Sequence, residues 1–316
     1  MTDKNIVLFL GNDFISLIFL NQFVPKLIDI GFNPLIVNVK SKNHNTSKEL
    51  QRYDFYQTQL LQDCLYSFIE KTGGNLFNLL TPKQIFTKYN IQTIETNNVN
   101  DPVFIKKLST YDFLGAISLR CFQIFKSDII DMINKKGFFG NSHPGVLPNY
   151  RGVYCMLRGI VNSDRTLGWT LHNIDKGIDT GSIISQTSYS NYSKEESLIP
   201  IMAKSVEDLS CGWINFIKDY DGKQNIKITI QQNKGNYYTY PTENEFSHWY
   251  QTKKLHPLVP KEIVKFYFDL FTQPDDKFKK EIQNFKVTMI TKVAQFETIM
   301  EMNDSEIKKP SKKKAA

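Results

Sequence analysis

The sequence has few of the residues that metal sites and disulfide scaffolds require. Its 316 residues include four cysteines, which stand singly, and five histidines, which form no His-x-x-x-His pair. Zinc sites need cysteine or histidine ligands at close spacing, so we expect no metal ion. Single cysteines without a Cys-x-x-Cys pair are typical of a reducing compartment, and they argue against a disulfide scaffold.

Long apolar runs and an N-terminal signal are also lacking. No run approaches the roughly 18 apolar residues that span a bilayer. The first residues do not show the positive, apolar and small-residue order of a secretory signal. These features predict a cytoplasmic protein that makes no membrane contact.

Most of the net positive charge comes from one end of the chain. The net charge is +7, but five lysines lie in the last nine residues, KKPSKKKAA. Because the rest of the chain is close to neutral, a surface that tracks nucleic-acid phosphates is not indicated. We expect residues 306–316 to be a disordered basic tail, whereas the 41% hydrophobic content elsewhere is that of a globular protein.

Strand and helix patterns alternate over the first half of the chain. Apolar strand patterns occur at 5–11, 33–39, 91–95, 113–119 and 137–140. Helical patterns occur at 14–30, 47–72, 81–89, 101–108 and 128–136, and we expect Ser127 to be the N-cap of the last of these. This alternation predicts an α/β fold with a mostly parallel sheet flanked by helices. Such sheets bind ligands outside the carboxyl ends of their strands.

The second half predicts further elements and a smaller α+β extension. A helix at 153–162 and strands at 167–174 and 182–189 are followed by a long helix at 193–220. A Ser193–Glu196 capping box opens this helix, and we expect Pro200 to kink it or to shorten its first turn. Residues 225–232 and 235–240 have the pattern of a hairpin, and helical patterns follow from 242 to 302. We therefore expect a catalytic core at 1–190 and a C-terminal unit at 191–305. Its helices and hairpin could form a dimer contact, and we expect a homodimer.

The stretch GNSHPGVLPNYRG, residues 140–152, combines two potential hydrogen-bond donors with rigid turn chemistry. Pro144 and Pro148 restrict the chain after His143. Asn141 and His143 stand two apart on an extended segment, so their side chains project to the same side. An amide and an imidazole so placed can stabilise an oxygen that becomes negative during acyl transfer, and one such donor contributes on the order of 3 kcal/mol.

The stretch DKGIDTG, residues 175–181, supplies two carboxylates, Asp175 and Asp179, directly after a predicted strand. A carboxylate beside an imidazole orients it and raises its basicity. No serine or cysteine nucleophile is evident, so the substrate would supply the attacking group. The loop after the first strand, GNDF, is neither a dinucleotide fingerprint nor a P-loop. The residues alone thus indicate a site for acyl transfer.

NSHPGVLPNYRG followed by GIDTG resembles the folate-dependent formyltransferases, which include methionyl-tRNA, glycinamide ribonucleotide and nucleotide-sugar formyltransferases. The resemblance implies a Rossmann-like core and transfer of a formyl group from N10-formyltetrahydrofolate to a primary amine. Asn141 and His143 would polarise the formyl oxygen, and Asp179 would orient His143 and help to move a proton. The implied pterin-binding residues are Phe122, Gln123, Ile124, Phe125, Val146, Leu147 and Asp175. Two positions depart from the family pattern: Ser142 replaces an aliphatic residue and Gly145 replaces a frequent serine.

The C-terminal half bears on the choice of amine. It lacks the glycine- and valine-rich pattern of the barrel that a tRNA formyltransferase carries. Instead, QQNKGNYYTYPTENEF resembles the hairpin and helix that follow the core in nucleotide-sugar N-formyltransferases, and Tyr150, Tyr237 or Tyr238 could pack on a base or sugar. We therefore expect a nucleotide-linked amino sugar as the acceptor. A methionyl-tRNA formyltransferase and a non-catalytic folate- or nucleotide-binding protein are the alternatives.

Overall fold

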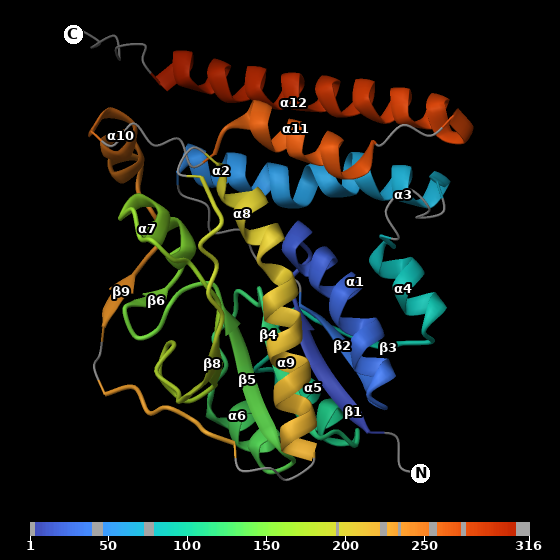
Figure 1. Ribbon diagram of the computed structural model, residues 1–316, viewed down its shortest axis with the longest axis vertical. Coiled ribbons are helices and arrows are strands. Elements are labelled where there is room, and N and C mark those ends of the chain that lie inside the picture. The colour runs from blue at the N-terminus through green and yellow to red at the C-terminus, as the bar shows by residue number, and fades with distance from the viewer. Residues whose placement is uncertain are drawn as a thin grey trace, which may run out of the picture.

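A seven-stranded sheet forms the centre of the molecule, and helices cover both of its faces (Figure 1). The computed structural model describes residues 4–39, 47–72, 79–193, 196–221, 226–232, 235–252, 258–272 and 276–307. The strands of the sheet are β1 (Asn5–Leu10), β2 (Asn33–Val39), β3 (Gln92–Thr96), β4 (Gly115–Leu119), β5 (Phe138–His143), β7 (Thr170–Asn173) and β8 (Ile183–Gln186). The predicted α/β fold with a mostly parallel sheet is confirmed.

The order of the strands is β3-β2-β1-β4-β5-β7-β8. The first five strands in this order are parallel to one another, whereas β7 runs antiparallel to both of its neighbours, β5 and β8. The order reverses between β1 and β4, so the carboxyl ends of these strands, at Leu10 and Leu119, border the crevice where open α/β sheets bind ligands.

Two apolar clusters lie on the two faces of the sheet. Ile6 and Leu8 of β1 belong to the larger cluster, and the intervening Val7 and Phe9 belong to the smaller one. This division follows from the alternation of side chains along a strand.

The helices are α1 (Phe14–Asp29), α2 (Lys48–Asp54), η1 (Phe55–Gln59), η2 (Leu61–Leu65), α3 (Tyr66–Thr72), α4 (Pro82–Lys88), α5 (Pro102–Ser109), α6 (Ser127–Asn134), α7 (Cys155–Val161), α8 (Leu198–Lys204), α9 (Val206–Asp221), α10 (Glu243–Thr252), α11 (Pro260–Phe271), η3 (Asp276–Phe278) and α12 (Lys279–Ile307).

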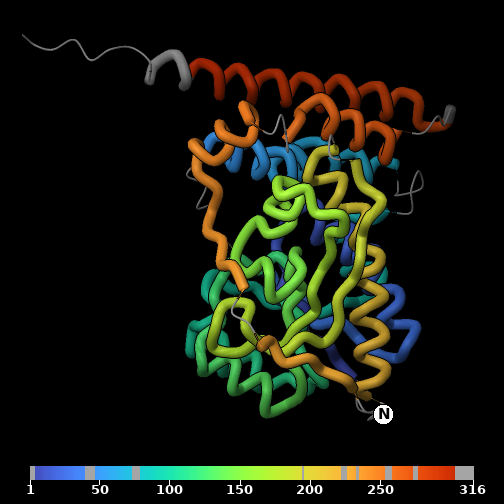
Figure 2. The backbone as a smooth tube through the Cα atoms, turned by 60° about the vertical axis from the view of Figure 1, so that its left-hand side comes forward, coloured from blue at the N-terminus to red at the C-terminus, as the bar shows by residue number. Residues whose placement is uncertain are grey.

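The larger cluster takes in α1 and α9, and the smaller one takes in α5 and α6 (Figure 1). The larger cluster also continues into the C-terminal helices. The rings of Phe14 in α1 and Tyr267 in α11 lie 5.0 Å apart, edge to face. In Figure 2, α12 extends along the end of the molecule away from the N-terminus. Among the described helices, none is long and apolar enough to cross a membrane.

Two predictions for the second half of the chain are wrong. Residues 226–232 do not form a hairpin with the segment after them. Thr229 instead makes an isolated antiparallel bridge with Ile183, and β9 (Asn236–Tyr238) pairs in parallel with β6 (Tyr150–Gly152). The alternation in 225–232 could indicate an extended segment but not its partner, because strand pairing is non-local.

The predicted long helix is two helices that meet at Ser205. The N-cap of α8 is Ser197 rather than Ser193. Ser205 is buried, and its hydroxyl accepts a hydrogen bond from the Trp169 indole N–H at 2.8 Å. Pro200 lies in the first turn of α8, where its missing N–H costs little. Likewise, α6 starts at Ser127, so this serine is the first helical residue and not the N-cap.

Candidate active site

A cavity of about 440 Å³ opens at the carboxyl ends of β4 and β5. Its walls include residues 120–125, 141–144, 152–154 and 177–179, together with His172 and Tyr237. The sheet therefore brings the two motifs together, although 27 residues separate Gly152 from Asp179 along the chain. Asn141, His143 and Asp179 all line this cavity.

The orientation of His143 is set by a main-chain carbonyl. Its Nε2 lies 2.6 Å from the Tyr150 carbonyl oxygen. A carbonyl can only accept, so Nε2 carries a proton and Nδ1 is the nitrogen that can gain or lose one. Nδ1 lies 3.4 Å from Asp179 Oδ2, which is longer than a charge-assisted hydrogen bond. This distance fits a neutral imidazole with a lone pair on Nδ1.

Burial lowers the pKa of His143 below its ordinary value, because the protonated ring loses its hydration. The Asp179 carboxylate raises this pKa in opposition, without overcoming the effect of burial. The imidazole is therefore neutral at pH 7, and it is ready to accept a proton on Nδ1. Asp179 would then stabilise the imidazolium that forms.

Among the described residues, three groups surround the Asp179 carboxylate: the Gly152 N–H, His143 and His172. Oδ2 accepts a 2.8 Å hydrogen bond from the Gly152 N–H, and Oδ1 lies 3.4 Å from His172 Nε2. Burial alone would raise the pKa of Asp179, but the positive charge that His143 and His172 carry when they are protonated, together with the Gly152 N–H, lowers it to about 2. The carboxylate is therefore charged at neutral pH.

A second buried histidine contacts Asn141. His172 Nδ1 lies 2.9 Å from the Asn173 carbonyl oxygen, so Nδ1 carries the proton and Nε2 accepts. Nε2 lies 3.1 Å from Asn141 Nδ2. The Asn141 NH₂ group thus points toward His172, and this contact uses one of its two N–H donors. Sequence reasoning missed His172 because its position opposite Asn141 follows from the register of β5 and β7.

Most of the predicted pterin-binding residues line the cavity, but two do not. Phe122, Gln123, Ile124 and Phe125 form one wall. Val146 instead borders a separate groove, and Leu147 is buried in the core. The cause is local: the main chain turns after His143, and Thr170 Oγ1 accepts from the Leu147 N–H and donates to the Gly145 carbonyl, which directs the loop inward.

Asp175 lies at the rim of the same cavity, where it stabilises a turn. Its Oδ1 accepts hydrogen bonds from the Gly177 N–H at 3.0 Å and from the Thr180 hydroxyl at 2.7 Å. The carboxylate therefore shapes the loop that carries Asp179. A contact between Asp175 and a pterin stays a prediction.

The two departures from the family pattern have structural explanations. Ser142 borders the cavity, and its hydroxyl accepts a 2.8 Å hydrogen bond from the buried Trp213 indole N–H. A side chain at Gly145 would place its Cβ 2.9 Å from His143 Nε2 and 2.6 Å from Cys155 Cβ. A serine at 145 would therefore press on the imidazole in this chain.

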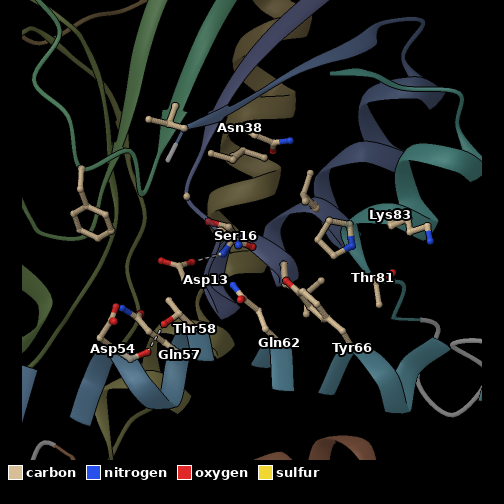
Figure 3. Close-up of a pocket in the computed structure, with 18 of the residues that line it drawn as sticks. Asp13, Ser16, Asn38, Asp54, Gln57, Thr58, Gln62, Tyr66, Thr81 and Lys83 are labelled. Carbon is tan, nitrogen blue, oxygen red and sulfur yellow. Dashed lines mark hydrogen bonds between the residues drawn. The ribbon is translucent and has the colours of Figure 1, made fainter. Parts of the chain in front are cut away.

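A second cavity, of about 680 Å³, adjoins the first (Figure 3). Phe122, Tyr154 and Tyr240 line both cavities. The second cavity lies at the carboxyl ends of β1 and β2. Polar side chains surround it, among them Asp13, Ser16, Asn38, Gln57, Thr58 and Gln62.

A buried ion pair stands between the two cavities. Arg120 Nε donates to Asp13 Oδ2 at 2.6 Å, and Arg120 Nη2 donates to Gln57 Oε1 at 2.9 Å. The Asp13 side chain is 3% exposed and that of Arg120 is 8% exposed. Asp13 also caps α1 by accepting a hydrogen bond from the Ser16 N–H. Within the described ranges, no group of three or more His, Cys, Asp or Glu side chains could hold a metal ion.

Comparison with known proteins gives matches over part of the chain. A family model described as Formyl transferase matches residues 78–207. Methionyl-tRNA formyltransferase of Thermodesulfovibrio yellowstonii is 31% identical over 123 residues, which cover 38% of this chain and 39% of that protein. The bifunctional polymyxin resistance protein ArnA of Wigglesworthia glossinidia brevipalpis is 36% identical over 112 residues, covering 35% of this chain and 16% of that protein. The chain therefore spans less than half of the length of these relatives.

Among solved structures, one match is the sugar 3N-formyl transferase WlaRD, whose structure was determined with dTDP and 5-N-formyl-THF. It aligns with this chain at 19% identity and a TM-score of 0.48. The alignment covers 75% of this chain and 70% of WlaRD. The matched range 78–207 contains Asn141, His143 and Asp179. The segment that carries these three residues is therefore similar to the formyl transferase family.

Proposed function

We propose that this protein transfers a formyl group from N10-formyltetrahydrofolate to the primary amine of a nucleotide-linked amino sugar. The observation that carries the proposal is the convergence of Asn141, His143 and Asp179 in a cavity that adjoins a second, polar one. Formyl transfer needs two such adjoining spaces, because the donor and the amine must meet at one carbon atom.

The residues of the first cavity fit a folate. Phe122 and Ile124 offer exposed apolar surface, and the main chain at 120–125 offers hydrogen-bonding groups. A fused pterin ring needs both kinds of contact. The folate co-substrate would supply the formyl group at the Asn141 end of the cavity.

The side chains of the site then have separate roles. The free N–H of the Asn141 amide would donate to the formyl oxygen as negative charge grows there, and His172 would keep the NH₂ group on that side. His143 Nδ1 would accept the proton that leaves the attacking nitrogen, directly or through a water molecule. Asp179 would stabilise the resulting imidazolium. The new C–N bond forms as the bond between the formyl carbon and N10 breaks, and the proton is returned to N10.

The second cavity supports a sugar as the acceptor. Asn38, Gln57, Thr58 and Gln62 provide amide and hydroxyl groups, which can both donate to and accept from sugar hydroxyls. A volume of about 680 Å³ is within the usual range for a small-molecule site. The alternative acceptor is methionyl-tRNA, which is favoured by the identity to a methionyl-tRNA formyltransferase.

The test is a panel of acceptors incubated with N10-formyltetrahydrofolate. Nucleotide-linked 3-amino and 4-amino sugars are compared with initiator methionyl-tRNA, and formylated product is identified by mass spectrometry. His143→Asn and Asp179→Asn should abolish transfer while folate still binds. Formylation of the tRNA alone would select the alternative, and transfer to none of the acceptors would contradict the proposal.

A further inference from the structure

The chain beyond α9 returns to the catalytic loop. Residues 226–232 run beside β8, where Thr229 and Ile183 exchange two main-chain hydrogen bonds of 2.8 Å. Two residues later, Gln231 reaches the loop that carries Asp179. Its Nε2 donates to the Asp179 carbonyl at 3.0 Å and to the Gly181 carbonyl at 2.7 Å. Both N–H groups of one amide therefore hold the two ends of a three-residue segment.

The segment held by Gln231 has an unusual backbone. Asp179 has a φ of +53°, in the left-handed region that residues with a side chain seldom adopt. In this conformation the Asp179 carboxylate reaches both His143 and His172. A left-handed non-glycine residue persists only where its surroundings hold it. The two hydrogen bonds from Gln231 act on the carbonyls at and just after this residue.

While the NH₂ group of Gln231 makes these two hydrogen bonds, the amide oxygen of the same side chain makes none to the described residues. Its Oε1 is buried, and it has no hydrogen-bond partner among the described residues. A buried acceptor without a partner is unfavourable. The orientation of the Gln231 amide is nevertheless determined, because the Asp179 and Gly181 carbonyls can only accept hydrogen bonds and must therefore face its NH₂ group.

The same C-terminal segment also holds the donor to the Asp179 carboxylate. The Gly152 N–H, which donates to Asp179 Oδ2, lies in β6. Tyr238 of β9 is the pairing partner of Gly152, and the next residue, Val153, donates its N–H to the Tyr238 carbonyl at 3.0 Å. In Figure 1, β9 lies beside β6. The segments 226–232 and 235–240 thus act on Asp179 in two ways: Gln231 binds its loop, and Tyr238 pairs with Gly152, whose N–H donates to the carboxylate.

We propose that Gln231 is a positioning residue of the active site, which holds Asp179 in its left-handed conformation with the carboxylate between His143 and His172. The inference rests on the proposed function for the role of Asp179 in transfer. It makes the described part of the C-terminal segment a component of the catalytic centre, rather than an appendage to a complete core.

The test compares two neighbouring glutamines. Gln231→Met keeps the length of the side chain and removes both donors, and Gln232→Met changes an exposed neighbour as the matched control. Gln231→Met should lower kcat by roughly 10- to 100-fold with KM nearly unchanged, because small misplacements of a catalytic group have effects of this size. Gln232→Met should match the wild type. Gln231→Glu, whose oxygens face two carbonyls, should lose at least as much activity as Gln231→Met.

A double-mutant cycle separates positioning from a general structural role. If Gln231 acts through Asp179, then Gln231→Met should not lower the pKa of His143 any further in an Asp179→Asn background, which an NMR titration measures without turnover. A lowering of the same size in both backgrounds, or an unchanged kcat in the Gln231→Met single variant, would overturn the proposal. Circular dichroism of each variant shows whether it is folded.

A second readout does not depend on turnover. The Asp179 carboxylate raises the pKa of His143, so its displacement in Gln231→Met should lower the pKa of His143 in an NMR titration, with the His143→Asn variant assigning the signal. An unchanged or raised pKa would refute positioning even if formyl transfer is established. Conversely, a lowered pKa in a protein that formylates no acceptor would uphold positioning and contradict the proposed function.

Discussion

The buried Asp13–Arg120 pair offers a sharp test of how this active-site crevice is stabilised. Asp13→Asn removes the negative charge but keeps an N-cap that α1 can use, since asparagine caps helices as well as aspartate. Arg120 remains charged, and its side chain is only 8% exposed. Removing one partner of a buried pair generally costs about 3 to 5 kcal/mol, because the other charge is left without compensation.

The magnitude for this site follows from the remaining contacts of Arg120. Gln57 Oε1 still accepts from Nη2, and the guanidinium still lies 4.7 Å from the centroid of the Phe122 ring. These two contacts still stabilise the buried charge of Arg120 in part. We therefore expect Asp13→Asn to lower the free energy of unfolding by about 3 kcal/mol, at the lower end of that range. Asp13→Ala also removes the N-cap and should cost about 1 kcal/mol more.

The measurement is urea denaturation followed by circular dichroism, with the exposed pair Lys265–Asp269 as the control. Lys265 and Asp269 side chains are 74% and 61% exposed, so Asp269→Asn should change the free energy of unfolding by less than about 0.5 kcal/mol. Asp13→Asn combined with Arg120→Met should cost less than the sum of the two single changes. If Asp13→Asn lowered the free energy of unfolding no more than Asp269→Asn does, the reasoning from burial would be refuted.

Three further predictions concern catalysis, packing and the C-terminus. If neutral His143 is the base, a pH–rate profile of the wild type should show kcat/KM falling on the acid side of a pKa below the ordinary histidine value, and an acid limb at or above that value would count against this role. Asp179→Asn should lower the pKa of His143 further, as an NMR titration of the inactive variant would show. Ser142→Ala should destabilise the protein by about 1 to 3 kcal/mol in thermal or urea unfolding, because the Trp213 indole N–H loses its acceptor; no change would mean that water replaces the hydroxyl. Deleting residues 306–316 should leave transfer to a nucleotide sugar unchanged in a steady-state assay, whereas a large, salt-dependent loss would indicate tRNA as the acceptor.

The local features of this protein could be predicted from its sequence because they depend on neighbouring residues. The apolar runs at 5–10 and 115–119 are buried strands, as an uninterrupted apolar pattern predicts for a sheet covered on both faces. The spacing of Asn141 and His143 places both side chains in one cavity, because alternate residues of a strand share a face.

Relations between distant segments could be predicted only in part. The motifs left Asp175 and Asp179 as candidate partners of His143, and the resemblance to the formyltransferases implied Asp179. The structure places the Asp179 carboxylate 3.4 Å from Nδ1. The tautomer of His143, however, is set by the Tyr150 main-chain carbonyl. Every residue type has such a carbonyl, so the identity of residue 150 does not indicate this contact. For the same reason, the sequence did not reveal the Gly152 N–H as a donor to the carboxylate.

Only the tertiary structure decided which strands pair and which side chains then meet. The antiparallel register of β5 and β7 sets Asn141 opposite His172, and the path of residues 226–240 brings Gln231 to the Asp179 loop. Alternating polarity in 226–232 is equally compatible with a hairpin, which the chain does not form. Periodicity along a segment determines the face on which each side chain lies, whereas the segment's partner depends on the packing of the whole chain.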